Sequence, residues 1–348
     1  MLVTALVTPF QEEGATPEDA LYARLTRFQL ERGADRVLVA GVEGEGPSLD
    51  DGERLALLDA ALQAARPEQI VYALGPGRPG ELVARGRQAL GRGVRDLLLV
   101  DAPYVGASSA DLRERWHRPV ARALPDCRLY PASAPLRTGT ELLPDDLARL
   151  RDECPNVAGV EDGTGRLARM RRVRELCGED FTILCADDGL LRDALIDPHI
   201  RADGGCSLLA NLVPAALRAL HDAAAALDAV AARELHDRLL PLLALSSVTA
   251  EEPVEVGGGQ LLVPQRSRGA VTLKTALALL GVLPASWRAP LGGMGAAGAA
   301  RVTAALLQAQ RSDPSLLQPL AAAFAVDPAA RLGHAAPALA AGGSTSLR

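Results

Sequence analysis

The sequence predicts an α/β fold, namely a (β/α)8 TIM barrel with additional C-terminal helices. Short apolar runs alternate with amphipathic stretches of helix length. Eight such runs begin roughly every 24 to 34 residues, the size of one β/α unit. None of them leads into a G-x-G-x-x-G turn with a helix behind it, which argues against an open dinucleotide-binding sheet.

Each expected strand is bounded by turn residues. The eight are Leu2–Val7, Arg36–Ala40, Gln69–Ala73, Asp96–Val100, Arg128–Tyr130, Val157–Val160, Phe181–Cys185 and Gly204–Leu209. Between the first two strands, Thr16 and Pro17 suit the N-cap and first position of a helix that ends at Gly33. The next helices are expected over about 50–65, up to Gly91, from about Ser109, from Pro144 and over Leu167–Leu176.

The barrel is expected to occupy residues 1–212, and a helical extension residues 213–311. Its helices are predicted over Val213–Leu227, Ala231–Leu245, Thr272–Leu280 and Ala296–Gln310. An insertion at 251–268, which contains glycine and proline, fits no element. Residues 312–348 are rich in Ala, Pro, Gly and Ser, which is typical of a flexible tail.

Composition narrows the class of protein. The chain has 348 residues, of which 48% are hydrophobic, so it can bury a large core. A net charge of −6 and the absence of a basic stripe with interleaved aromatics argue against nucleic acid. Five cysteines without a C-x-x-C pair indicate reduced thiols and a cytoplasmic protein. No apolar run is long enough for a membrane span.

The stretch from Asn156 to Gly165 is the most informative one. An apolar run ends in Glu161 and Asp162, followed by Gly-Thr-Gly. Two acids at the exit of a buried strand are costly to desolvate, so they should face a cavity, a partner or a ligand. The only lysine of the chain, Lys274, lies far away in sequence, so no lysine amine is provided at this junction.

Active sites of such barrels lie at the C-terminal ends of the strands. The polar residues expected there are Thr8, Glu43, Glu45, Tyr104, Tyr130, Arg137, Glu161, Asp162, Asp187, Asp188 and Asn211. Arg137 is suited to clamp a carboxylate and Tyr130 to relay a proton. Purely structural roles compete with these: the tyrosines as packing residues, Arg137 in a surface ion pair, and Glu43 and Glu45 as helix caps.

An ordered set of motifs lies at the expected strand ends, namely Val-Thr-Pro-Phe10, Gly41-Val-Glu-Gly-Glu45, Ala-Pro-Tyr104, Leu-Tyr130 with Arg-Thr-Gly139, Gly159-Val-Glu-Asp-Gly-Thr-Gly165, Ala-Asp-Asp-Gly189 and Ala-Asn211-Leu-Val-Pro214. This set resembles the dihydrodipicolinate synthase / N-acetylneuraminate lyase family. The resemblance covers roughly residues 1 to 310 and implies a homodimer or homotetramer. Most members make or break a C–C bond to pyruvate, or dehydrate a sugar acid, through a lysine Schiff base.

Departures from that pattern bear on the chemistry. The resemblance puts Glu161 at the Schiff-base lysine, Val42 and Glu43 at the paired threonines, and Val105 at a second tyrosine. A carboxylate cannot form an imine, so pyruvate-imine chemistry is not expected. Lys274 matches an outer helix of the family, which makes it a poor substitute.

The expected function is therefore altered lyase or hydro-lyase chemistry on a small polar metabolite. Tyr130 and Glu161 are the predicted catalytic residues. The predicted substrate-binding residues are Thr8, Val42, Glu43, Tyr104, Arg137, Asp187 and Asn211. No cofactor or metal is expected, although Glu43, Glu161 and Asp187 together would suit Mg²⁺ or Mn²⁺. The alternative is a non-catalytic ligand-binding or regulatory paralogue.

Overall fold

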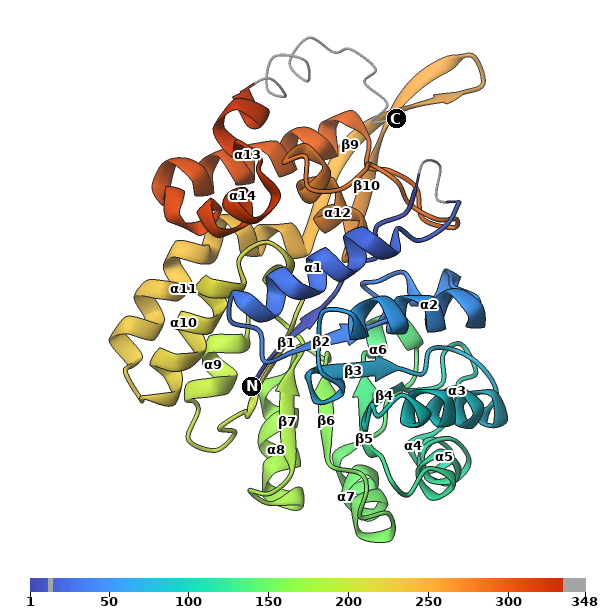
Figure 1. Ribbon diagram of the computed structural model, residues 1–348. Helices are drawn as coiled ribbons and strands as arrows, with labels where there is room; N and C mark the ends of the chain where they lie inside the picture. Colours follow the sequence, from blue (N-terminus) through green and yellow to red (C-terminus); the bar gives the residue numbers. More distant parts are fainter. Residues whose placement is uncertain (12–14, 334–348) are drawn as a thin grey trace.

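The computed structural model of the protein describes residues 1–11 and 15–333. Eight parallel strands close a barrel in chain order, and β1 pairs with both β2 and β8 (Figure 1). This confirms the predicted TIM barrel. The strands are β1 Leu2–Ala5, β2 Arg36–Val39, β3 Ile70–Ala73, β4 Asp96–Val100, β5 Arg128–Ser133, β6 Gly159–Asp162, β7 Thr182–Cys185 and β8 Gly204–Ser207.

Helices connect successive strands on the outside of the barrel. They are α1 Asp19–Glu31, α2 Asp51–Leu62, α3 Pro79–Gly91, α4 Ser109–Asp111, α5 Arg118–Ala123, α6 Pro135–Thr138, α7 Pro144–Glu153, α8 Leu167–Cys177 and α9 Leu191–Ile196. A π-helical turn, Leu112–His117, joins α4 to α5. Helix α1 begins three residues after the predicted cap, because Pro17 forms a β-bridge with Phe10 instead.

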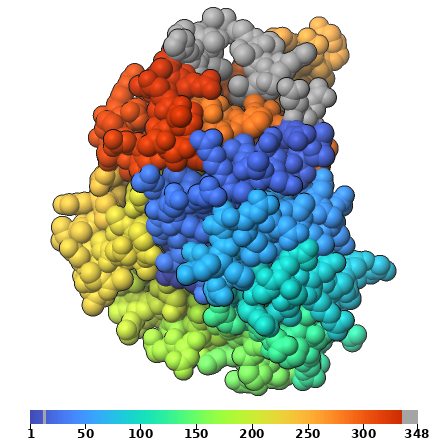
Figure 2. All heavy atoms as spheres, viewed as in Figure 1, coloured from blue at the N-terminus to red at the C-terminus, as the bar shows by residue number. Residues whose placement is uncertain are grey.

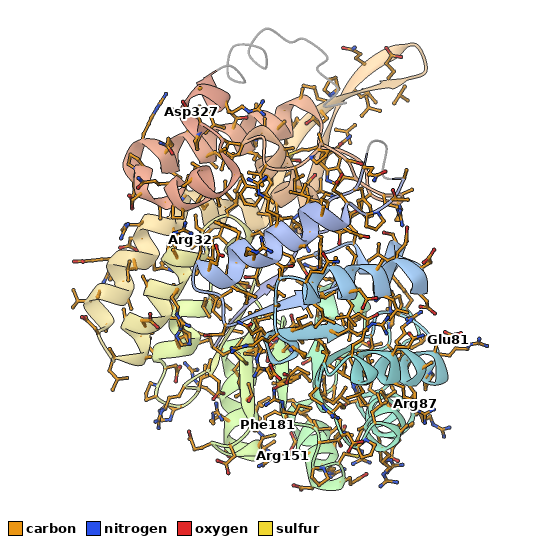
Figure 3. The ribbon with its side chains drawn as sticks, in the orientation of Figure 1. Arg32, Glu81, Arg87, Arg151, Phe181 and Asp327 are labelled. Carbon is orange, nitrogen blue, oxygen red and sulfur yellow. The ribbon has the colours of Figure 1, made fainter. Side chains whose placement is uncertain are left out.

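Apolar side chains fill two layers. A small inner cluster lies inside the barrel and includes Ala5, Leu98, Ala132 and Cys206. A much larger cluster lies between the strands and the surrounding helices. At the N-terminal end of the barrel, the Arg151 guanidinium stacks 5.7 Å from the centre of the Phe181 ring (Figure 3). The inner cluster combines alanines and Cys206 with larger leucines and valines, so the barrel interior is filled by side chains.

The last third of the chain packs on the barrel as a helical extension. It consists of α10 Pro214–Ala225, α11 Ala229–Leu243, α12 Ala270–Leu279, α13 Ala296–Ser312 and α14 Gln318–Phe324. The segment predicted as a flexible tail thus contains a helix, because Leu320 and Phe324 are buried and Phe324 packs edge-on against Phe28 of α1. Residues 334–348 of that segment lie outside the described residues.

The unplaced insertion forms an antiparallel hairpin. Strands β9 Ser247–Val256 and β10 Gly259–Arg268 pair along their whole length around a Gly257–Gly258 turn with positive φ at both residues. The tip stands off the body of the protein (Figures 1 and 2). The middle of β9 is anchored through Glu252, whose carboxylate accepts hydrogen bonds from the Ala297 and Gly298 amides in the first turn of α13.

Strand β5 is longer than predicted. Pro131 suggested a break after Tyr130, yet the strand continues through Ser133, with Pro131 opposite Leu99 of β4. The predicted end of β6 is also displaced, since Glu161 and Asp162 are its last two residues. Ala132 rather than Tyr130 is therefore the β5 neighbour of Glu161.

A buried ion pair joins the helical extension to the barrel. The Lys274 ammonium of α12 is 2.5 Å from Glu45 Oε1, and both side chains are almost fully buried. The Phe10 ring lies 4.5 Å from the ammonium, and the Arg288 amide donates to the other Glu45 oxygen. Glu45 follows β2, so this pair fixes the loop 41–49 relative to α12. Within the described part of the chain, no helix is long and apolar enough to cross a membrane.

We predict that Lys274→Met destabilises the protein by about 3 to 5 kcal/mol, because it leaves the Glu45 carboxylate buried without its cation. The free energy of unfolding in denaturant is the measurement. The double variant Lys274→Met/Glu45→Gln should be more stable than Lys274→Met alone, since a neutral amide needs no counter-charge. A double variant no more stable than the single one would mean that the ion pair is not the cause.

Candidate active site

The two acids at the end of β6 point to opposite sides of the barrel wall. Side chains alternate along a strand, so Glu161 turns inward, where Cys206 of β8 is its neighbour. Asp162 turns outward toward α8 and is fully buried. Successive residues of one strand thus present one carboxyl to the barrel mouth and one to the barrel wall.

Asp162 is neutralised where it lies. Arg169 of α8 forms an ion pair with its carboxylate, and the same guanidinium donates to Ser133 Oγ at 3.2 Å and to the Leu142 carbonyl at 2.7 Å. The Thr164 amide and hydroxyl donate to the other oxygen of Asp162. This network ties the C-terminal ends of β5 and β6 to the following loops, so Asp162 serves to position the site.

Among the residues that the structure describes, no cation pairs directly with Glu161 as Arg169 does with Asp162. Its side chain is partly exposed at the mouth of the barrel. Desolvation raises its pKa to about 7, and the negative charge of Glu43 acts in the same direction. Burial, together with Glu161 and Glu43, raises the pKa of Cys206 well above its ordinary value, so the thiol stays protonated. A carboxyl that titrates near neutrality can both accept and donate a proton.

Glu43 and Arg137 form an ion pair at the same mouth. Arg137 Nη2 lies 2.5 Å from Glu43 Oε1, and both side chains keep some exposure to solvent. Glu43 comes from the loop after β2, and Arg137 from α6, directly after β5. The positive charge of Arg137 lowers the pKa of Glu161, against the larger opposing effects of burial and Glu43.

Tyr130 does not join this group. It lies two residues before Ala132 on β5, and a side chain at Gly159 would collide with its ring. Its neighbours are Arg36 and Asp96, the first residues of β2 and β4, so the hydroxyl faces the N-terminal half of the barrel. Burial raises its pKa. The sequence misplaced Tyr130 because the end of β5 was set three residues too early.

Two predicted substrate-binding residues use their side chains for hydrogen bonds to the backbone of neighbouring loops. The Thr8 hydroxyl is buried and donates to the Gly44 carbonyl at 2.6 Å, next to Glu43. Asn211 is buried, accepts from the Val7 amide and donates to the carbonyls of Ala5 and Leu208. Both side chains fasten loops around the mouth, and their polar atoms are already used.

The remaining predicted site residues border the mouth with differing exposure. Tyr104 has a left-handed backbone and is 90% exposed, beside exposed Val105, and Val42 is half-buried next to Glu43. Asp187 accepts from the Gly189 amide in its own turn. Asp188 accepts from the Leu209 amide, and burial raises its pKa to about 6. In the residues that the structure describes, no group of three or more His, Cys, Asp or Glu side chains could hold a metal ion.

The chain is similar to known proteins over most of its length. A profile of the Dihydrodipicolinate synthetase family matches residues 1–257. The chain belongs to this family. Among curated relatives, the 4-hydroxy-tetrahydrodipicolinate synthase of Parasynechococcus marenigrum is 34% identical over 256 residues, 73% of this chain and 83% of the relative. The synthase of Pseudomonas aeruginosa is 31% identical over 241 residues, 69% and 80% of the two chains.

Solved structures of the family share the fold. The dihydrodipicolinate synthase of Aquifex aeolicus superposes with a TM-score of 0.78 at 24% identity, covering 91% of this chain and 98% of that one. The match to the family profile ends at residue 257, inside the turn of the β9–β10 hairpin. The match to the profile therefore includes every barrel strand and ends where the hairpin turns.

Three contributors to the site were missed from the sequence. Cys206 lies beside Glu161 because the side chains of both residues point into the barrel interior. The only indication of this in the sequence was that Cys206 falls on a predicted strand. Arg169 lies in an arginine-rich helix, yet it and Arg174 are buried. Ala132 gave no chemical signal at all.

We predict that the stability of the protein falls as Glu161 ionises. Its folded pKa lies above the unfolded value of 4.5, so the folded state binds this proton more tightly and the free energy of unfolding decreases between about pH 4.5 and 7. Glu161→Gln removes the titration. Relative to wild type, the variant should gain about 1 to 3 kcal/mol between pH 4.5 and pH 8, the lower part of the range reflecting partial exposure of the side chain.

Denaturant unfolding at the two pH values measures this gain. Glu68→Gln, which removes an exposed carboxyl at the other end of the barrel wall, controls for the loss of a charge. A stability difference between Glu161→Gln and wild type that is the same at both pH values would contradict the assignment.

Proposed function

We propose that this family member works without a lysine imine and uses Glu161 as a general acid–base on a small polar carbonyl compound. The observation that carries the proposal is the Glu161 carboxyl, which lies inward at the end of β6 with a pKa of about 7 and has no direct cationic partner in the described part of the chain. The environment of the single lysine, Lys274, also supports a mechanism without an imine. Its amine is buried in the ion pair with Glu45, and burial lowers its pKa.

The reaction class that suits such a group is elimination of water from a β-hydroxy carbonyl compound. Ionised Glu161 takes the proton from the carbon next to the carbonyl, and the electron pair of that C–H bond forms the new C=C bond. The C–O bond to the β-hydroxyl breaks, and the protonated Glu161 returns its proton to the leaving oxygen, so water departs and the carboxylate is regenerated. One carboxyl with a pKa near 7 serves both steps.

A non-catalytic ligand-binding role is the second candidate. Strand β5, next to Glu161, favours this binding role, because Ala132 supplies no proton-relaying hydroxyl and Tyr130 faces the opposite end of the barrel.

For either candidate function, we propose that copies of the chain associate. Exposed Tyr104, Val105 and Leu136, on the loops after β4 and β5, form an apolar border of the mouth that suits self-association.

Exchange of carbon-bound protons in D₂O separates the two candidates. With hydroxyacetone as the probe, the wild-type protein should accelerate exchange at the carbon next to the carbonyl, measured by ¹H NMR. The rate should rise with pH and level off above about 7, because ionised Glu161 is the base.

Glu161→Gln should reduce the rate to that of buffer, whereas Glu68→Gln should leave it unchanged. Equal exchange by Glu161→Gln and wild type would overturn the role of Glu161. Exchange by neither protein would favour the binding role.

A further inference from the structure

Arg137 is the residue of the mouth best suited to bind an anion. A guanidinium presents two parallel N–H groups that match the two oxygens of a carboxylate. In this structure a carboxylate of the chain itself already occupies it, because Glu43 Oε1 lies 2.5 Å from Arg137 Nη2. The pair joins the loop after β2 to α6 across the C-terminal end of the barrel.

The Glu43 side of this pair is held firmly. The two residues that follow Glu43 are both fixed. The Thr8 hydroxyl donates to the Gly44 carbonyl, and Glu45 forms the buried ion pair with Lys274. Arg54, almost fully buried, donates to the Gly46 carbonyl in the same loop. The carboxylate of Glu43 therefore extends from a loop with little freedom to move away.

The hairpin closes the pair from the other side. Gly269, directly after β10, lies so close that a Cβ atom there would be 3.6 Å from Arg137 Nη2 and 3.8 Å from Glu43 Oε1. Its φ of +57° is a conformation that side chains rarely adopt. Gly269, at the end of the hairpin that lies beyond the match to the family profile, thus borders the ion pair.

We propose that Glu43 is a specificity-determining residue, an internal carboxylate that occupies Arg137 and makes the mouth reject small carboxylates such as pyruvate. A ligand carboxylate would have to break the ion pair, and it would leave Glu43 facing Glu161 without a cation between them. Ligands without a carboxylate leave the pair intact. The inference rests on the proposed function only in taking the same mouth as the ligand site.

Glu43→Gln tests the proposal, because an amide keeps the size of the side chain but releases the guanidinium. Non-covalent pyruvate binding is measured by titration calorimetry at pH 7.5, with thermal unfolding as the check that each variant is folded. Glu43→Gln should bind pyruvate at least tenfold more tightly than wild type. Glu81→Gln, which breaks the exposed Arg78–Glu81 pair on α3, should bind like wild type.

A second variant keeps the test decisive. Arg137→Gln combined with Glu43→Gln should lose the gained affinity, since the guanidinium is the group that would hold the carboxylate. Pyruvate binding by wild type as tight as by folded Glu43→Gln would overturn the proposal, and so would a gain that survives in the double variant. Absence of proton exchange with hydroxyacetone would remove the catalytic proposal but leave this result unaffected.

Discussion

The alternation of side chains along β6 is the constraint on which the site depends. It separates two adjacent acids by the thickness of the barrel wall, and the two then meet opposite environments. Asp162 is neutralised by the buried guanidinium of Arg169 and becomes part of the framework. Burial beside Cys206 and Glu43 raises the pKa of Glu161 to about 7 at the mouth. Neighbouring positions thus hold one acid that is neutralised by an ion pair and one whose pKa is raised to about 7.

The helical extension matters to this mouth as well as to stability. Lys274 of α12 holds the loop that carries Glu43, and Gly269, at the start of α12, borders the Glu43–Arg137 pair. Residues more than two hundred positions apart therefore define one side of the mouth. Changes in the hairpin, which leads into Gly269, have a direct structural route to the charged groups at the strand ends.

Much of the fold was predictable from the sequence, because eight buried strands leave apolar runs at the spacing of one β/α unit. The ends of those strands were less accessible. Pro131 is typical of a strand break, yet β5 continues through it, and this three-residue difference moves Tyr130 from the mouth to the opposite half of the barrel. Long-range partners were also beyond local patterns, as the burial of Arg169 and the meeting of Glu43 with Arg137 show.

The proposed function works without an imine, whereas the family resemblance implies a lysine Schiff base for most members. Trapping with borohydride in the presence of pyruvate, read by intact mass, tests this most directly. Because the only lysine amine is buried against Glu45, the protein should keep its unmodified mass. A reduced pyruvate adduct that maps to Lys274 would contradict the account, since it would require the ion pair to open and the amine to reach a substrate.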